Sequence, residues 1–224
     1  MFTRKKTILY ITVTTKILLL VAIGFATAAF IHASNAVYLS DRIVDVSHRI
    51  NLTVLGAETG QRGYIITDQD SYLESYNYAV ANLDGQLNDL NLSSEAAGTV
   101  YPQTNSVNDL AHRKMDELYE TIKLRKTKSF EAAQKLVASG SGQDYMLHLE
   151  HMLNQIIDKE RVRTEHYEEI IRWTGFLIIG GLVGFSILAI ITVFIARGAV
   201  AVVTYPIDPN VLGSPENPQN DPRI

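Results

Sequence analysis

Hydrophobic residues gather in two long runs near the ends of this chain, and a largely polar segment separates them. The first run predicts a membrane span over residues 17–36, and the second predicts one over residues 173–196. A helix needs about 20 apolar residues to cross roughly 30 Å of hydrocarbon. The second run has no charged residue, and Trp173 and Arg197 border it as anchors typical of a membrane interface.

The first run has an alternative interpretation. Small residues at Ser34 and Ala36 also suit cleavage of a secretory signal peptide. We favour a retained anchor, because a long segment precedes Ile17 and a helical pattern follows Ala36.

Basic residues predict the orientation of the chain. Arg4, Lys5, Lys6 and Lys16 precede the first span, and no acidic residue accompanies them. The positive-inside rule therefore places residues 1–16 in the cytoplasm. With two spans, the segment 37–172 lies outside. The tail 197–224 returns to the cytoplasm, where its prolines predict disorder.

The central segment predicts amphipathic helices. Its apolar residues recur at steps of three and four, which is the spacing of one helix face. Four such stripes follow one another: Leu39, Ile43, Val46, Ile50, Val54 and Ala57; Leu73, Tyr76, Val80, Leu83, Leu87 and Leu90; Val107, Ala111, Met115, Leu118 and Ile122, resuming weakly at Phe130, Ala133 and Leu136; and Tyr145, Leu149, Met152 and Ile156. The predicted fold class is all-α, an extracytoplasmic up-down four-helix bundle flanked by two transmembrane helices.

Turn-forming residues separate the stripes. Thr67 and Asp70 have the spacing of a capping box that would open the second helix. The later breaks contain Ser93, Ser94, Gly98 and Pro102, and then residues 139–142. In an up-down bundle, an even number of helices brings the chain back to the side from which it started. The first span is therefore expected to continue directly into the first helix, and the fourth helix into the second span.

Both spans contain small residues at GxxxG-type spacing. Gly24 and Ala28 lie in the first span, and Gly180 and Gly184 lie in the second. Such pairs allow helix backbones to approach closely, although glycine is also common in membrane helices without a packing role.

Composition excludes several classes of function. A formal net charge of −4 argues against nucleic-acid binding. The absence of cysteine excludes disulfides, zinc–thiolate sites and a cysteine nucleophile. We find no catalytic triad spacing, paired carboxylates or nucleotide-binding glycine loop, so no enzyme and no cofactor are predicted. His148 and His151 have metal-ligand spacing but lack a third ligand, and no metal site is predicted.

Residues 58–64, Glu-Thr-Gly-Gln-Arg-Gly-Tyr, are followed by Tyr72, Leu73 and Tyr76, and this pattern resembles the signature of the third type of CHASE domain. Val137 to Met146, with Asp158 and Glu160 after them, is also similar to that family. The resemblance covers about residues 36–173. It implies a periplasmic or extracellular sensor in the plasma (inner) membrane, usually dimeric and associated with histidine kinases of two-component systems or with cyclases.

The signature supplies the candidate site. Glu58 and Arg62 form either an intrahelical ion pair or a polar clamp for a ligand. Tyr64, Tyr72 and Tyr76 either stack on a small ligand or belong to the core. Thr59, Gly60 and Gly63 are motif residues with a structural role, the glycines serving a turn or a close helix contact.

The sequence predicts a signal-input module. It would detect an unknown extracytoplasmic stimulus and relay it to a separate partner: a histidine kinase, a cyclase or a chemoreceptor. A separate partner is expected because such sensors normally continue into an output domain, whereas only the short tail follows the second span here. The alternatives are a structural or adaptor membrane protein, perhaps a homodimer without a small ligand, and a truncated remnant of a longer sensor.

Overall fold

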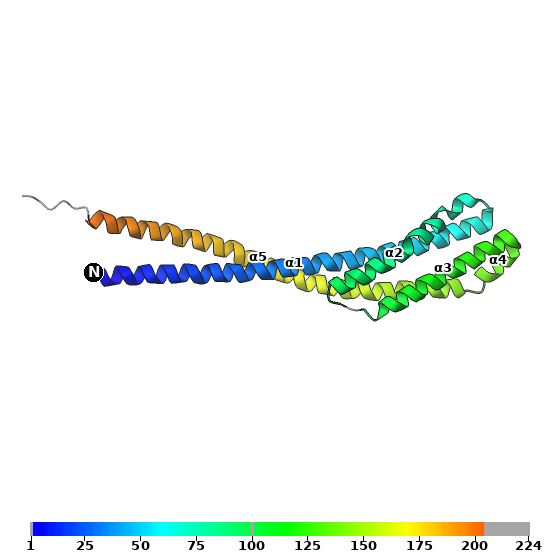
Figure 1. The fold of residues 1–224 in the computed structure, drawn as a ribbon, viewed down its shortest axis with the longest axis horizontal. Coiled ribbons are helices and arrows are strands. Elements are labelled where there is room, and N and C mark those ends of the chain that lie inside the picture. The colour runs from blue at the N-terminus through cyan, green and yellow to red at the C-terminus, as the bar shows by residue number, and fades with distance from the viewer. Residues whose placement is uncertain (1, 100, 204–224) are drawn as a thin grey trace, which may run out of the picture. The chain divides into compact units, whose positions relative to one another are not determined.

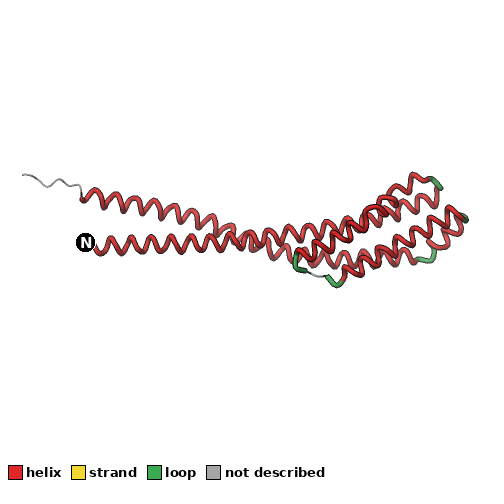
Figure 2. The backbone as a smooth tube through the Cα atoms, viewed as in Figure 1, coloured by secondary structure: helices red, strands yellow, loops and turns green. Residues whose placement is uncertain are grey.

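The computed structural model describes residues 2–99 and 101–203, and these form an all-α fold, as the sequence predicted. The elements are α1 (Phe2–Thr67), the 3₁₀ helix η1 (Asp70–Leu73), α2 (Glu74–Ala96), α3 (Gln103–Thr127), α4 (Phe130–Val137) and α5 (Ser141–Val203). Short connections join them (Figure 2). Helix α5 continues into the predicted tail as far as Val203, and residues 204–224 lie outside the described part of the chain.

The described residues form two compact units. Of these residues, unit 1 contains 2–25 and 177–203, and unit 2 contains 26–99 and 101–176. Helices α1 and α5 each continue from one unit into the other without a break. In unit 2, segments of α1 and α5 join α2 and α3 in an up-down bundle (Figure 1).

The core of unit 2 draws on all four predicted stripes. Its main cluster consists of Ile43, Val46, Ile50, Val54, Leu83, Leu87, Leu90, Tyr101, Val107, Ala111, Leu149, Leu153 and Ile156. One predicted core position is wrong, because Val80 is 59% exposed and Ala79 faces the core in its place. The predicted stripe omitted Ala79 because a single methyl group contributes little to a hydrophobic pattern.

The first turn differs from the predicted capping box. The 3₁₀ helix begins after Gln69 without a side-chain cap. Thr67 instead closes α1: its hydroxyl donates to the carbonyl oxygen of Gly63 and accepts from the backbone amide of Gln69. Asp68 follows with φ 62°, the left-handed conformation that often ends a helix. The capping signature was wrong because the same residue types also suit a helix end.

The other two breaks occur where the sequence placed them. Gly98 and Gly140 have φ of 66° and 78°, a conformation that strongly favours glycine. The weak continuation of the third stripe is a separate helix, α4, opened by Ser129, whose side chain accepts a hydrogen bond from the amide of Ala132. The described part of the chain therefore adds two short helices, η1 and α4, to the four predicted for the bundle.

Both long helices contain segments that are long and apolar enough to cross a membrane, with mean hydropathy of 2.1 and 2.7. Within unit 1 the closest small-residue approach involves Gly181, where an added Cβ would lie 2.7 Å from Ile23. Gly184 lies beside Leu19, whereas Gly24 and Gly180 have nothing within 4 Å of an added Cβ. The helix pair therefore packs through Gly184, as expected, and through Gly181 in place of its neighbour Gly180.

Candidate functional site

The signature segment 58–64 lies inside α1, in the last turns before the helix ends. Glu58, Gln61 and Tyr64 are buried, and Arg62 lies on the exposed side. The expected ion pair is present, with Arg62 Nη2 donating to Glu58 Oε1 at 2.6 Å. The segment packs against the turn that leads into α2 and against α3, so it is a junction of three elements.

Gly60 and Gly63 allow the start of the second helix to approach α1. A methyl group on Gly60 would overlap the backbone carbonyl of Tyr72, and one on Gly63 would overlap the Tyr72 ring. Both glycines lie within α1 and serve a close contact rather than a turn. Tyr72 therefore lies directly on the helix backbone, and its side chain is still 44% exposed.

A buried charge network connects α1 to α3. Lys114 Nζ lies 3.4 Å from Glu58 Oε1 and 3.1 Å from Glu117 Oε2, and the Lys114 side chain is only 2% exposed. Thr121 donates a further hydrogen bond to Glu117 at 3.1 Å. With Arg62, the network holds two positive and two negative groups. Burying charges is costly unless they are paired, and this network pairs them.

Helix α5 closes over the same network through Gly142. A methyl group at Gly142 would overlap the Glu117 carboxylate and approach Lys114 Nζ to 2.9 Å. Gly142 is buried near the start of α5. The charged groups therefore lie where α1, α3 and α5 meet, so any shift between these helices must rearrange them.

Tyr64 fills the end of the bundle. It packs with Leu73 and Ile122 in a small buried cluster, and Lys126 Nζ lies 5.4 Å from the centre of its ring. Burial raises the pKa of Tyr64, and the neighbouring Asp68 carboxylate raises it further. Tyr64 is a core residue with its hydroxyl near charged groups, which makes it unsuited to direct stacking on a ligand from solvent.

Tyr76 is also packed into the bundle. It is half-buried and contacts both the Tyr64 cluster and a second cluster formed by Ala57, Ala79 and Leu118. Burial raises the pKa of Tyr76, with a further contribution from Tyr119. The structure therefore brings the signature tyrosines to one end of the bundle, with Tyr72 the most exposed of the three.

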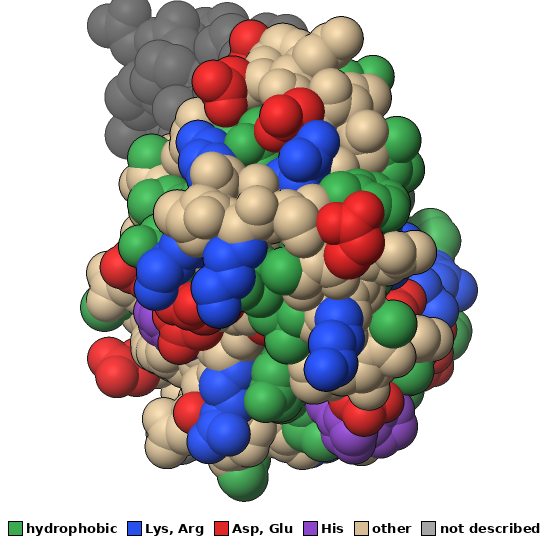
Figure 3. Space-filling model, turned by 90° about the vertical axis from the view of Figure 1, so that its right-hand side faces the viewer, with side chains coloured by type: hydrophobic (Ala, Val, Ile, Leu, Met, Phe, Trp, Pro, Cys, Tyr) green, Lys and Arg blue, Asp and Glu red, His purple; other side chains and the backbone are tan. Residues whose placement is uncertain are grey.

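Basic residues at the end of α3 tie down the turn after α1. Arg125 donates to the carbonyl oxygen of Ile65 at 2.9 Å and lies 3.5 Å from Asp68, and Lys126 lies 3.6 Å from Asp70. Basic and acidic side chains are interspersed over this end of unit 2 (Figure 3). Arg125 and Lys126 thus balance the acidic residues Asp68 and Asp70 of the turn.

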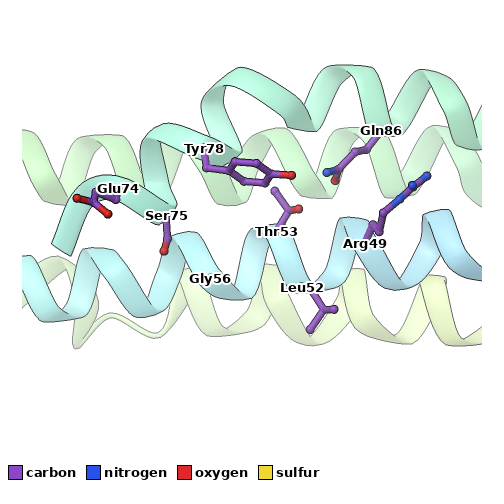
Figure 4. Close-up of a pocket in the computed structure, with 8 residues that line it drawn as sticks. All are labelled: Arg49, Leu52, Thr53, Gly56, Glu74, Ser75, Tyr78 and Gln86. Carbon is purple, nitrogen blue, oxygen red and sulfur yellow. The ribbon is translucent and has the colours of Figure 1, made fainter. Parts of the chain in front are cut away.

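An open groove runs along α1 and α2 beside the signature. It has a volume of about 600 Å³ and is lined by Arg49, Leu52, Thr53, Gly56, Glu74, Ser75, Tyr78 and Gln86 (Figure 4). A second hollow of about 480 Å³ shares Leu52, Gly56, Glu74 and Ser75 with it, and continues to Gly60 and Tyr72. The groove is therefore continuous with the contact between the signature glycines and Tyr72.

The family model of the CHASE3 domain matches residues 33–169, more than half of the chain. The chain belongs to the CHASE3 domain family. This family is an extracellular sensory domain family, and the two apolar helices indicate a membrane protein. No curated protein and no solved structure matches the chain.

The CHASE3 domain has a second buried polar network at the opposite end of its bundle. Tyr101 donates its hydroxyl hydrogen to Glu160, whose side chain is fully buried. Arg163 donates to Glu160 at 3.3 Å, to the Thr99 hydroxyl at 2.9 Å and to the Ala97 carbonyl at 3.2 Å. Burial and the bond to Glu160 raise the pKa of Tyr101. This network fastens the connection between α2 and α3 to α5.

Lys114 was not among the predicted site residues, although the sequence contains a signal for its role. Lys114 lies three residues after Ala111 and four before Leu118, on the apolar stripe of α3. A lysine on such a stripe needs a buried partner, and Glu58 and Glu117 supply it. The groove residues Arg49, Tyr78 and Gln86 gave no comparable signal, because the groove forms only when α1 and α2 pack together.

Proposed function

We propose that this CHASE3 protein is a membrane-anchored signal-input module of the plasma (inner) membrane. It detects an extracytoplasmic stimulus and relays it through α1 and α5 to a signalling output in the cytoplasm, with both termini on that side. The observation that carries the proposal is helix continuity: α1 and α5 each join an apolar segment to the sensory bundle without interruption. The sensory character of the family supports the direction of information flow.

The packing of the bundle supports a mechanical relay. The network of Glu58, Lys114 and Glu117 joins α1 to α3 beneath Gly142 of α5. A ligand that displaces one of these helices must move the others, because packed interiors respond by discrete shifts of whole elements. Since α1 and α5 are hydrogen-bonded throughout, a displacement in the bundle passes along them.

The signature residues contribute to this function in two ways. Arg62 and Tyr72 have exposed side chains, so they are the signature positions from which we propose direct ligand contact. Glu58 and Tyr64 are buried and Tyr76 is half-buried, and we propose that these respond to the ligand through their packing.

Topology is tested by cysteine labelling, for which the chain offers a cysteine-free background. Ser106 is exposed in α3, and Ser106→Cys should react with a membrane-impermeant maleimide on intact cells. Thr3→Cys, in the predicted cytoplasmic segment, should react only after the cells are permeabilised. Protection of Ser106→Cys in intact cells would overturn the proposed function.

The relay is tested by cross-linking in the membrane followed by affinity purification of the tagged full-length chain. We expect a histidine kinase, a cyclase or a chemoreceptor among the captured proteins, and loss of its signal when the chain is deleted. Capture of no signalling protein, together with an unaltered response on deletion, contradicts the relay.

A structural or adaptor homodimer without a ligand is the second candidate. The small residues Gly24 and Gly180 have open space around them, which suits contact with a second copy in the membrane. Gly24→Leu and Gly180→Leu should abolish self-association if this face is used. A dimer that both variants preserve argues against that face.

A further inference from the structure

The groove between α1 and α2 carries opposite charges at its two ends. Arg49 lies at one end and Glu74 at the other, with Leu52 and Tyr78 between them (Figure 4). Among the described residues Arg49 pairs only with Asp45, at 3.4 Å, and an exposed ion pair of this kind contributes little. Glu74 has no ion-pair partner in the described part of the chain. Both charges are therefore available to a ligand.

The floor of the groove is formed by small residues. Thr53 and Gly56 lie beneath it, and the apolar side chains of Leu52 and Tyr78 are 65% and 56% exposed beside it. A ligand can therefore approach the backbone of α1 and cover apolar surface at the same time, which favours binding.

Gln86 adds an unsatisfied acceptor. Its Oε1 atom is buried and has no hydrogen-bond partner in the described structure. Figure 4 shows the Gln86 amide directed along the groove toward the Tyr78 hydroxyl, close to the Arg49 end. A buried acceptor without a donor is unfavourable. Rotation of the Gln86 amide toward the groove would let Oε1 accept a hydrogen bond from a ligand N–H group, which would be stabilising.

The register of the two helices sets the length of the ligand. A Cβ added to Gly56 or Gly60 would lie 3.9 or 3.6 Å from the Cβ of Ser75, so Ser75 and its neighbour Glu74 are level with about residue 58 of α1. Arg49 then lies about 13 Å away along the helix, at a rise of 1.5 Å per residue. An extended peptide of about four residues spans this distance at roughly 3.3 Å per residue.

We infer that the groove binds a short extended peptide with free termini. The terminal carboxylate binds Arg49, the terminal ammonium binds Glu74, and a peptide N–H group near the carboxylate donates to Gln86 Oε1. Side chains of the peptide pack on Leu52 and Tyr78. This assignment rests on the proposed sensory function and names the class of its stimulus.

Charge complementarity favours a zwitterion over other small molecules. A dianion such as a phosphate ester would be repelled by Glu74, and a polyamine would be repelled by Arg49. A neutral sugar would leave both charges unused. A peptide also supplies the N–H donor that Gln86 lacks.

The test uses the full-length protein in lipid nanodiscs and tetra-alanine as the probe, with binding measured by isothermal titration calorimetry. We expect saturable binding, weakened by about tenfold or more when the probe is N-acetylated or C-amidated, as for loss of a charge-assisted hydrogen bond. Di-alanine, which is too short to reach both charges, should bind as weakly as the blocked peptides.

Two variants locate the site. Gly56→Met fills the groove floor from a half-buried helical position, where an added Cβ has only Ser75 at 3.9 Å, and should abolish binding. Arg49→Gln should weaken binding by about tenfold or more and remove the penalty for C-amidation. Arg113→Gln is the matched control, because Arg113 also forms an exposed pair with an aspartate four residues earlier but lies outside the groove. It should bind tetra-alanine normally.

Several results overturn the assignment. The first is the absence of saturable tetra-alanine binding at millimolar concentration. The second is binding that Gly56→Met and Arg49→Gln leave unchanged. The third is a concentration-dependent dimer that Gly56→Met abolishes, because that result would assign the groove to a second copy of the chain. Failure of peptide binding with normal labelling of Ser106→Cys refutes the groove alone. Protection of Ser106→Cys refutes the proposed function whatever the peptide does.

Discussion

Lys114 of α3 lies 3.4 Å from Glu58 of α1, and both side chains are buried. This contact joins the signature segment to a helix about fifty residues away in the sequence. Glu117 and Arg62 complete the network, in which Arg62 is the solvent-exposed member and the two positive charges balance the two negative ones.

Removing the cation of this network should destabilise the protein strongly. Lys114→Met leaves the carboxylates of Glu58 and Glu117 buried near each other, and breaking a buried pair in this way costs about 3–5 kcal/mol. For a chain of this size the melting temperature should fall by roughly 6–20 °C. Circular dichroism of the full-length protein in nanodiscs measures the shift.

The control is Lys123→Met, which breaks an exposed pair of similar length, 3.1 Å between Lys123 and Glu120. Its cost should stay below about 1 kcal/mol. Equal melting temperatures for the two variants would show that the buried network contributes no more than a surface pair.

The signature glycines should tolerate no side chain. Gly60→Ala places a methyl group on the carbonyl of Tyr72, which belongs to the backbone and cannot rotate away. Gly63→Ala meets the Tyr72 ring, so Tyr72→Ala should restore much of the stability lost in that variant. Thermal unfolding of the single and double variants measures both effects.

Gly85→Ala is the control for helix propensity. Gly85 lies inside α2 with nothing within 4 Å of an added Cβ, so alanine should stabilise the protein by about 0.5–1 kcal/mol. A stabilising Gly60→Ala would mean that Tyr72 does not lie against α1.

Tyr101 should make the protein sensitive to alkaline pH. Its pKa is raised above the ordinary value of 10.0 by burial and by the bond to Glu160, with Arg163 opposing the shift. As the pH rises, the Tyr101 hydroxyl therefore loses its proton at a lower pH in the unfolded chain than in the folded protein. The stability contributed by the raised pKa is complete below about pH 10 and decreases above it.

Thermal unfolding between pH 8 and pH 11 tests this expectation. Tyr101→Phe should have a lower melting temperature at pH 8, because Glu160 loses a donor, and a shallower decrease above pH 10. Tyr119→Phe is the control, since the Tyr119 side chain is exposed. If the melting temperatures of the wild type and Tyr101→Phe decreased in parallel as the pH rises, the raised pKa of Tyr101 would not be the cause of the alkaline sensitivity.

His112 should titrate above its ordinary pKa of 6.5. Its hydrogen bond to the Asn108 carbonyl is the main cause, and the Asp84 carboxylate 3.0 Å away adds to it. The stabilisation is present below about pH 6.5 and is lost as the pH rises through the folded pKa. NMR titration should show a lower His112 pKa in Asp84→Asn, and an unchanged value would exclude the contact.

Much of the fold follows from local patterns in the sequence. Ile43, Val46 and Ile50 recur at helical spacing, and each is fully buried. The ion pair between Glu58 and Arg62 was also predictable, because residues four apart on a helix are neighbours. Local patterns failed at Val80, and at Thr67, where polar residue types suit both the start and the end of a helix.

The sequence by itself determined the helices, the two apolar segments and the family signature, because each depends on residues close together along the chain. Only the tertiary structure decided that Lys114 meets Glu58, that Tyr72 covers Gly60 and Gly63, and that Arg49 and Glu74 lie at the ends of one groove. These contacts depend on the register and rotation of separate helices around a shared core, which the spacing within any one helix does not specify.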